Sequence, residues 1–309
     1  MPTTAQRRVI DPILSKVVQG YKHPEHVGMA LFPRVPVTVA GGKVIEFGKE
    51  AFRLYNTLRA PGTATKRVSF GYEGKPYALE NHALEAPVPR EHQRDAQNVP
   101  GIDLATRAIN GVMRVESLIL ENQQASAARA AGNYDANHKV TLAGTDQWND
   151  YAQSDPVGDV KNAKEAIRAS TGIYPNVIEI SAKVFAVLSE HPAITDKIKY
   201  TQTGVVTAEL LAAVFDIQTV VIGKAIGFDD AGDAIDLWGK DVVLAYVPPN
   251  PSGMEEPSFG YTYTMEGHPL VEVPYWENQS KSWIYGTAYE RAPVLSGIAS
   301  GFLIINAVP

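Results

Sequence analysis

The sequence predicts a mixed α+β fold that combines extended segments, one long helix and a compact α/β unit. Three observations lead to this prediction. The first forty residues contain five prolines, which prevent one continuous helix and favour an extended arm. Residues 102–131 contain no proline and carry apolar side chains at helical spacing. From residue 160 to about residue 286, helix-like and strand-like segments alternate, which is typical of a mixed α/β unit.

Length and composition exclude several classes of protein. The 309 residues, 45% of them hydrophobic, can fill the cores of two compact units. The longest apolar run, residues 301–308, is too short to cross a bilayer, so we expect a soluble protein that is not exported. The absence of cysteine excludes disulfides and thiol nucleophiles. A net charge of −6 argues against a protein that binds nucleic acid by neutralising phosphates.

In the first hundred residues the pattern predicts an arm followed by a long hairpin. Residues 10–19 are the only stretch of the arm that favours a short helix. Residues 44–47 and 68–72 read as strands, the second because apolar and polar residues alternate in it. Pro61-Gly62 lies between them and is a good turn signal. The segment is therefore expected to form a long hairpin or a looped-out arm.

Residues 102–131 give the strongest helix prediction in the chain. Apolar residues recur along one face of this helix at Leu104, Ala108, Val112, Val115 and Ile119. An unbroken helix of this length extends over roughly 45 Å, and Gly132-Asn133 supplies a natural stop. We expect Gly111 to weaken or bend it.

The remaining elements are predicted to build the α/β unit. Asp155-Pro156 supplies an N-cap and a first-turn proline for a helix through Ala169, which Thr171-Gly172 ends. Further helices are expected at 182–190 and 209–215, and a buried strand at 219–222, because that stretch is short, apolar and β-branched. Other strands are expected at 176–180, 241–247, 260–265 and 283–289.

Motifs for phosphate, nucleotide or metal binding are incomplete. Gly41-Gly42-Lys43 lacks the spacing of a phosphate-binding loop, and Gly223, Gly227 and Gly232 stand too far apart to cradle a pyrophosphate. Pro24 separates His23 from His26, and no third ligand is obvious. The aspartates at 229, 230, 233 and 236 lack the ligand order of a calcium loop, so a solvated hairpin tip is the better interpretation.

Catalytic patterns are incomplete as well. Ser296 and Ser300 lack the flanking glycine of a nucleophile elbow, and Glu255-Glu256 lies in a proline-rich loop with no sign of burial. The alternating aromatics Phe259, Tyr261 and Tyr263 are interpreted as core residues of a strand. We therefore predict no catalytic residue, no cofactor and no metal.

Several stretches, in order along the chain, resemble the major capsid proteins of tailed bacteriophages. They are LFPRVPV (31–37), KVIEFGKEAF (43–52), RAPGT (59–63), LAGTDQWNDYAQSDPVGDV (142–160) and the segment 171–201. None of these motifs is diagnostic alone. The specificity comes from their shared order, which covers nearly the whole chain.

This resemblance implies the HK-ninety-seven-like capsid fold. In this division, residues 1–43 are the N-terminal arm, 44–95 the extended loop and 96–160 the peripheral domain with its spine helix. Residues 161–285 are the α/β axial domain, and 286–309 form a C-terminal strand that returns to the peripheral domain.

The resemblance also implies a structural function. The chain would self-assemble as hexamers and pentamers into an icosahedral head around a double-stranded DNA genome, without sequence-specific DNA binding and without a membrane. It would be assembled in the host cytoplasm and end in the virion. Its partners would be a separate scaffolding protein and a portal, and a decoration protein is left open. The alternatives are a bacterial nanocompartment shell, a tail or baseplate protein, or a hydrolase on the α/β unit.

The extended loop is the predicted site of contact between subunits. A lone hairpin cannot cover its own apolar side chains, so a neighbouring subunit is expected to cover them. These side chains are Phe47, Phe52, Val68, Phe70 and Tyr72. Three arginines of the same segment, Arg53, Arg59 and Arg67, are expected to pair with acidic groups on that neighbour.

Overall fold

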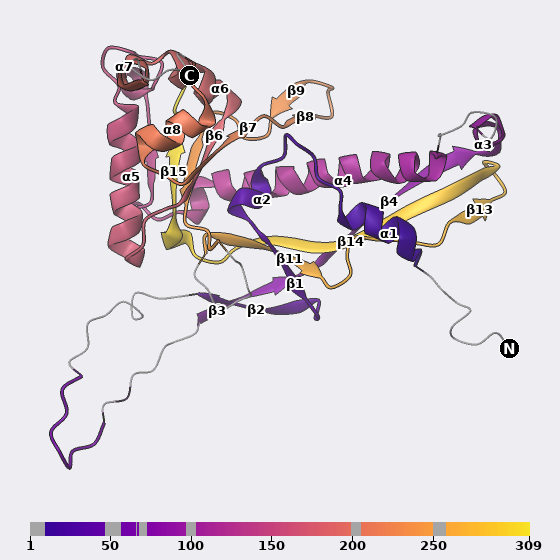
Figure 1. Cartoon of the computed structure of the whole chain (residues 1–309), viewed down its shortest axis with the longest axis horizontal. Coiled ribbons are helices and arrows are strands. Elements are labelled where there is room, and N and C mark those ends of the chain that lie inside the picture. The colour runs from indigo at the N-terminus through magenta and orange to yellow at the C-terminus, as the bar shows by residue number, and fades with distance from the viewer. Residues whose placement is uncertain are drawn as a thin grey trace.

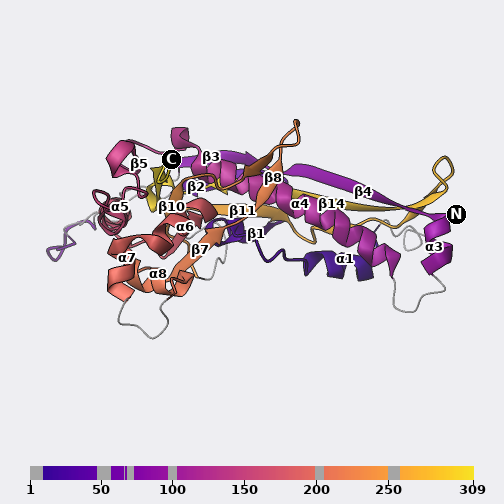
Figure 2. The ribbon, with the colours of Figure 1, turned by 90° about the horizontal axis from the view of Figure 1, so that it is seen from above.

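The computed structural model describes residues 10–46, 57–65, 67, 73–96, 103–198, 205–249 and 258–309. Within them, a six-stranded sheet and the long helix α4 lie along each other, and a five-stranded sheet with helices α5 to α8 lies at one end of α4 (Figure 1). Figure 2 shows the same elongated arrangement from above. The predicted α+β class is confirmed.

The N-terminal arm consists of α1 (Pro12–Gln19), α2 (Gly28–Leu31) and β1 (Arg34–Val37). Asp11 caps α1, because its Oδ1 accepts hydrogen bonds from the backbone N–H groups of Ile13 (2.9 Å) and Leu14 (3.0 Å). This confirms the short helix predicted at residues 10–19. β1 runs parallel to β11 (Gly260–Met265), so the end of the arm is a strand of the larger sheet.

Helix α4 (Leu104–Arg129) confirms the predicted long helix to within two residues at each end. Asp103 caps it by accepting from the backbone N–H groups of Ala105 (3.0 Å) and Thr106 (3.3 Å). These two N–H groups would otherwise lack an intrahelical partner.

The predicted apolar face of α4 is wrong in part. Val115 and Ile119 are 48% and 36% exposed, whereas the buried face contains the polar residues Glu116, Glu121 and Gln124. The apolar residues of the buried face are Ile109, Val112, Met113, Leu120, Ala125 and Ala128. Hydropathy assigns acidic side chains to the solvent side, and it cannot show that these ones have buried partners.

The six-stranded sheet is organised around β14 (Ser282–Leu295). β14 pairs antiparallel with β4 (Glu80–Pro89) along the whole of β4, and also with β11. The short strands β12 (Leu270–Val271) and β13 (Tyr275–Glu277) pair with it as well. The predicted strands at 260–265 and 283–289 therefore exist but lie outside the α/β unit to which they were assigned. Pairing between segments about 200 residues apart leaves no local sequence signal.

The core prediction for the aromatic strand is confirmed. Phe259, Tyr261 and Tyr263 are at most 1% exposed. Tyr263 stacks on Tyr77, with 4.4 Å between ring centroids. Tyr77 belongs to β3 (Glu73–Ala78), which forms a two-stranded ladder with β2 (Gly41–Glu46). The predicted strand at 44–47 corresponds to β2, and the one predicted at 68–72 lies outside the described residues.

The five-stranded sheet has the order β5-β15-β10-β6-β7. Its strands are β5 (Lys139–Thr141), β15 (Gly301–Ile305), β10 (Val242–Ala245), β6 (Val177–Ser181) and β7 (Thr219–Gly223). Its helices are α5 (Pro156–Thr171), α6 (Ala182–Glu190), α7 (Pro192–Ile198) and α8 (Ala208–Phe215). The cap prediction for α5 is confirmed, since Asp155 accepts from Gly158 N–H (2.9 Å) and Gly172 ends the helix with φ 74°.

One expectation about this sheet is wrong. β7 was predicted to be buried, but it ends the sheet order and its Thr219 is exposed. The return of residues 286–309 to the peripheral domain stays a prediction: β15 lies in the five-stranded sheet, where it pairs with β10 and with β5, and β5 lies within the predicted peripheral residues 96–160. A short apolar strand has the same local pattern in either sheet, so sequence alone cannot assign it.

The remaining elements are short. They are α3 (Arg90–Ala96), β8 (Ile226–Phe228), β9 (Ala234–Asp236) and the 3₁₀ turns Ala131–Asn133, Gly144–Asp146 and Ile298–Ser300. β8 and β9 form a hairpin whose tip is exposed, which confirms the interpretation of the aspartate cluster as a solvated turn. Among the described residues, no helix combines the length and apolar character needed to cross a membrane.

Candidate functional site

The side chain of Glu121, on α4, holds the N-terminal arm in place. Its carboxylate accepts hydrogen bonds from the backbone N–H groups of Val27 (2.9 Å) and Gly28 (2.9 Å). It also accepts one from Trp238 Nε1 (2.8 Å). A single buried acid thus connects the arm, the long helix and the segment that follows β9.

A second set of hydrogen bonds holds the arm against α4 and β11. Gln124 Nε2 donates to Thr262 Oγ1 (2.8 Å), which in turn donates to the backbone carbonyl of Phe32 (2.9 Å). A Cβ at Gly28 would lie 2.2 Å from Gln124 Oε1 and 2.9 Å from Glu121 Oε2, so a larger residue there would have to displace the side chains that hold the arm. The arm up to β1 is therefore part of the subunit's own core and not a free tail.

Two buried acids near this junction have raised pKa values. Burial raises the pKa of Glu121, although its three hydrogen-bond donors oppose the shift. Burial, reinforced by the nearby carboxylate of Glu121, raises the pKa of Glu179 on β6 well above its usual range. Glu179 is fully buried, and burial favours the neutral form of its carboxyl over the charged form.

Replacing Glu179 with glutamine is expected to flatten the pH dependence of stability. The folded pKa lies above the unfolded one, so the folded chain binds the extra proton and stability falls as pH rises above about 4.5. One extra bound proton changes the free energy of unfolding by at most about 1.4 kcal/mol per pH unit. Urea unfolding of wild type and Glu179→Gln between pH 5 and 8 measures the difference. Parallel stability curves would contradict the raised pKa of Glu179.

Arg291 and Glu116 form a buried ion pair between β14 and α4. Arg291 Nη1 lies 3.0 Å from Glu116 Oε2, and the two side chains are 0% and 2% exposed. The guanidinium also lies over the ring of Tyr289, 4.5 Å from its centroid. Burial lowers the pKa of Arg291, and the Glu116 carboxylate acts against that shift. This pair fixes the helix against the sheet.

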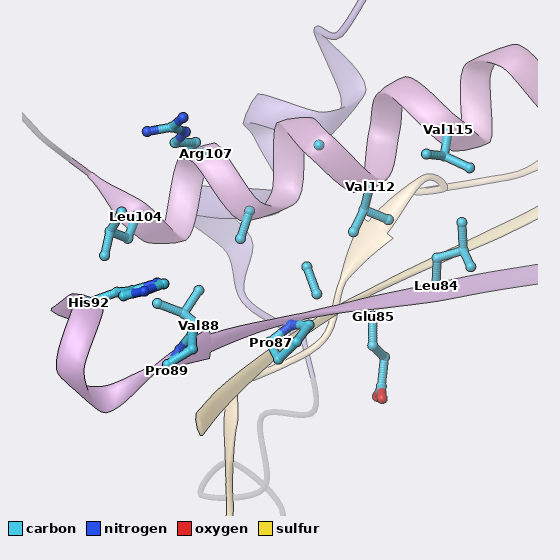
Figure 3. A pocket seen from close by; sticks show the side chains of 13 residues that line it. Leu84, Glu85, Pro87, Val88, Pro89, His92, Leu104, Arg107, Val112 and Val115 are labelled. Carbon is cyan, nitrogen blue, oxygen red and sulfur yellow. The ribbon is translucent and has the colours of Figure 1, made fainter. Parts of the chain in front are cut away.

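An open apolar groove of about 750 Å³ lies between α4 and β4. Leu104, Val112 and Val115 line it from the helix, and Leu84 and Val88 from the strand (Figure 3). His92 and Arg107 lie at its rim, whereas the Glu85 side chain points away from the helix. The apolar residues that the sequence assigned to the helix core thus partly line an open surface, which suits contact with another protein better than chemistry on a small molecule.

The structure describes only two of the eight residues that were predicted to contact a neighbouring subunit. Phe47, Phe52, Arg53, Val68, Phe70 and Tyr72 lie outside the described residues. Arg59 and Arg67 are exposed, and Arg59 Nε donates to the Thr63 carbonyl (2.7 Å). Thr63 N–H donates to the Ala60 carbonyl (3.2 Å) and Gly62 has φ 82°, which confirms the predicted Pro61-Gly62 turn.

The histidine pair gives no sign of a metal site. The rings of His23 and His26 stack, with centroids 4.2 Å apart. Burial and the neighbouring His23 lower the pKa of His26 to about 4. In the described part of the chain, no three histidine, cysteine or acidic side chains gather closely enough to hold a metal. The absence of a metal remains a prediction.

Sequence reasoning missed Glu116, Glu121 and Arg291. A signal was present for Glu116, because Val112, Glu116, Leu120, Gln124 and Ala128 recur every four residues along α4, and all five are buried. Polar residues at apolar positions of one helix face indicate buried partners. They do not indicate which partners.

Comparison with known proteins identifies the family. Residues 133–289 match the family described as phage major capsid protein E. The major capsid protein of Burkholderia phage BcepMu is 36% identical over 98% of both chains. The crystal structure of a phage-related protein from Bordetella bronchiseptica has a TM-score of 0.86 and 48% identity, covering 98% of this chain and 100% of that one.

More distant structures share the fold alone. The mature capsid of bacteriophage PhiM1 has a TM-score of 0.55 at 13% identity and covers 94% of this chain and 90% of its own. An encapsulin from Synechococcus elongatus has a TM-score of 0.53 at 10% identity over 96% and 95% of the two chains. The predicted HK-ninety-seven-like fold is confirmed, and the nanocompartment alternative shares only the fold. Given the match over nearly its whole length, this chain belongs to the phage major capsid proteins, which form the shell of the virion and are not enzymes.

Proposed function

We propose that this capsid protein assembles as hexamers and pentamers, and that the extended loop reaches onto a neighbouring subunit. Of the residues predicted for this loop, 44–95, only those before β4 can form the intersubunit arm, because β4 pairs with β14 in the subunit's own sheet. The supporting observation is the exposure of the described tip. Residues 57–65 and 67 are all exposed, and residues 57–65 lie well away from both sheets (Figure 1). An ordered turn that lies apart from its own subunit is placed to contact another one.

The groove between α4 and β4 supports the same proposal. Exposed apolar surface of this kind is costly in a monomer and becomes favourable when a second subunit covers it. The groove and the loop tip belong to different parts of the subunit, so each offers a separate surface for contact with another subunit.

The proposed division of the chain follows the two observed sheets. Residues 1–43 form the arm, and α4 with the six-stranded sheet forms the peripheral domain. The five-stranded sheet with α5 to α8 forms the axial domain. The predicted boundaries were 96–160 for the peripheral domain, 161–285 for the axial domain and 286–309 for the C-terminal strand. In the division proposed here, strands β11 to β13 belong to the peripheral domain instead of the axial domain, and β15 belongs to the axial domain.

Further partners belong to the same proposal. A separate scaffolding protein and a portal direct assembly in the host cytoplasm, and the closed icosahedral shell surrounds double-stranded DNA without sequence-specific contacts. The net charge of −6 fits a container that does not neutralise its genome. A decoration protein is left open.

Replacing residues 52–66 with a short Gly-Ser turn is expected to abolish shell formation and leave the subunit folded. The tip is exposed and lies apart from both sheets, so its loss removes contacts with other subunits only. Sedimentation under assembly conditions measures the shells, and circular dichroism with thermal melting measures the fold.

A matched variant carries a Gly-Ser segment of the same length as the one removed. If the original side chains make the contact, both variants fail to assemble. If only the length of the loop matters, the variant with the full-length Gly-Ser segment assembles. Normal shells from the short variant, or unfolding of the whole chain, would contradict the intersubunit arm.

A further inference from the structure

We propose that the β8–β9 hairpin (residues 226–236) is the surface on which the loop tip (residues 57–65 and 67) of a second copy of this chain docks. This inference rests on the proposed function, because it names the partner surface of the intersubunit arm. Its support is the apolar character, the charge and the position of the hairpin.

The hairpin exposes large apolar side chains that its own subunit does not cover. Ile226 and Phe228 are 50% and 75% exposed. They are two residues apart on one strand, so they point to the same face. Ala234 pairs with Phe228 in the ladder and extends that face, and it is also exposed. An exposed phenylalanine beside an isoleucine is typical of a contact surface.

The hairpin turn is held by its own hydrogen bonds. Asp229 Oδ1 accepts from the backbone N–H groups of Ala231 (2.9 Å) and Asp233 (2.9 Å). At the base, Lys183 Nζ pairs with Asp236 (2.7 Å). These contacts occupy Asp229 and Asp236, and the exposed side chains of Asp230 and Asp233 carry charge at the tip. A preformed surface loses little freedom when it binds.

The two segments have opposite charge. Residues 226–236 contain four aspartates and no basic residue, whereas residues 57–67 contain Arg59, Lys66 and Arg67 and no acidic residue. The loop tip also carries Leu58, which is 87% exposed, beside Ala60 and Pro61. Both segments thus combine apolar side chains with charges of a single sign. Complementary charge sets the register of such a contact and excludes wrong partners.

Position excludes a contact within one subunit. The loop tip and the hairpin lie far apart in both views (Figures 1 and 2). Two complementary patches at distant places on one chain form a heterologous contact, which closes into a ring when copies are related by rotation. A second copy is therefore the partner that supplies the matching patch.

Charge exchange between the two segments tests this pairing. We expect Asp230→Lys/Asp233→Lys, and separately Arg59→Glu/Arg67→Glu, to raise the protein concentration needed for shell assembly about tenfold, equivalent to about 1.4 kcal/mol per contact. The chain carrying all four substitutions is expected to assemble near the wild-type concentration. Phe228→Ser is expected to weaken assembly by a similar factor. The subunit melting temperature stays unchanged in all four variants, because the altered side chains are exposed.

The matched control is Asp196→Lys/Glu266→Lys, which makes the same charge change at exposed positions outside the hairpin. It is expected to assemble as wild type does. Failure of the four-substitution chain to regain assembly overturns the pairing. Normal assembly of the hairpin variants, with failure of the shortened loop described above, means that the arm docks elsewhere. Normal assembly of the shortened loop itself contradicts the arm and the pairing together.

Discussion

Glu116→Ala is expected to destabilise the subunit by about 3 to 5 kcal/mol, because it leaves the charge of Arg291 buried without its partner. Arg291 is fully buried and its guanidinium lies 3.0 Å from the Glu116 carboxylate. Domains unfold with a free energy of only about 5 to 15 kcal/mol, so soluble yield falls sharply.

The size of this effect comes from the uncompensated charge and not from the strength of the pair. Bringing two charges out of water costs nearly as much as their attraction returns, so removal of both is far less damaging than removal of one. Tyr289 stacks on the guanidinium but supplies no negative charge. It cannot replace the carboxylate.

Urea unfolding of three variants separates the cost of the unpaired buried charge from the strength of the ion pair. Glu116→Ala is expected to be the least stable, whereas Glu116→Leu/Arg291→Met keeps the volume without charge and stays within about 2 kcal/mol of wild type. Arg291→Met alone lies between them, with the carboxylate able to take up a proton. If Glu116→Ala costs less than the double substitution, the pair does not act as a compensated buried charge.

Local structure was predictable wherever a chemical signal marks it. Asp155-Pro156 and Gly172 fixed both ends of α5, because capping and a left-handed backbone favour those residue types. The helix at 182–190 and the strand at 260–265 agree with α6 and β11 at both ends. In each case the determining interaction lies within a few residues along the chain.

The assembly of these elements into sheets was not predictable. β14 pairs with β4 across about 200 residues, and β15 lies between β5 and β10. A strand's own sequence reports how its two faces are solvated, but it does not report which strand lies beside it. The resemblance to capsid proteins supplied the fold that local patterns could not.

The same difference between local and long-range interactions decides which candidate surfaces were predictable. The Pro61-Gly62 turn and the aspartate hairpin were visible in the sequence, because both depend on local turn chemistry. The groove was not, because Val112 and Val115 look like core residues until the position of β4 is known. Glu121 was not predicted as a contact residue, because its partners in the arm and at Trp238 lie about 90 to 120 residues away in the sequence.

Val112→Pro is expected to cost about 3 kcal/mol or more, since it removes a helical hydrogen-bond donor and its ring clashes with the preceding turn. Val112 lies in the interior of α4 and is 7% exposed. The neighbouring turns carry Glu116 and Glu121, so a break here also displaces the carboxylates that hold Arg291 and the arm. Both the circular dichroism signal of helix and the yield of soluble subunit should fall.

Gly111→Ala is the matched control at the adjacent position. A Cβ at Gly111 meets nothing within 4 Å, so alanine adds no clash and is expected to stabilise the helix by roughly 0.5 to 1 kcal/mol. Thermal melting of both variants beside wild type gives the comparison. Opposite shifts at neighbouring positions identify the helical backbone as the cause, because general sensitivity of this region to substitution would lower both melting temperatures. A Val112→Pro chain that melts and assembles as wild type does would show that the stability of the subunit does not depend on an unbroken α4.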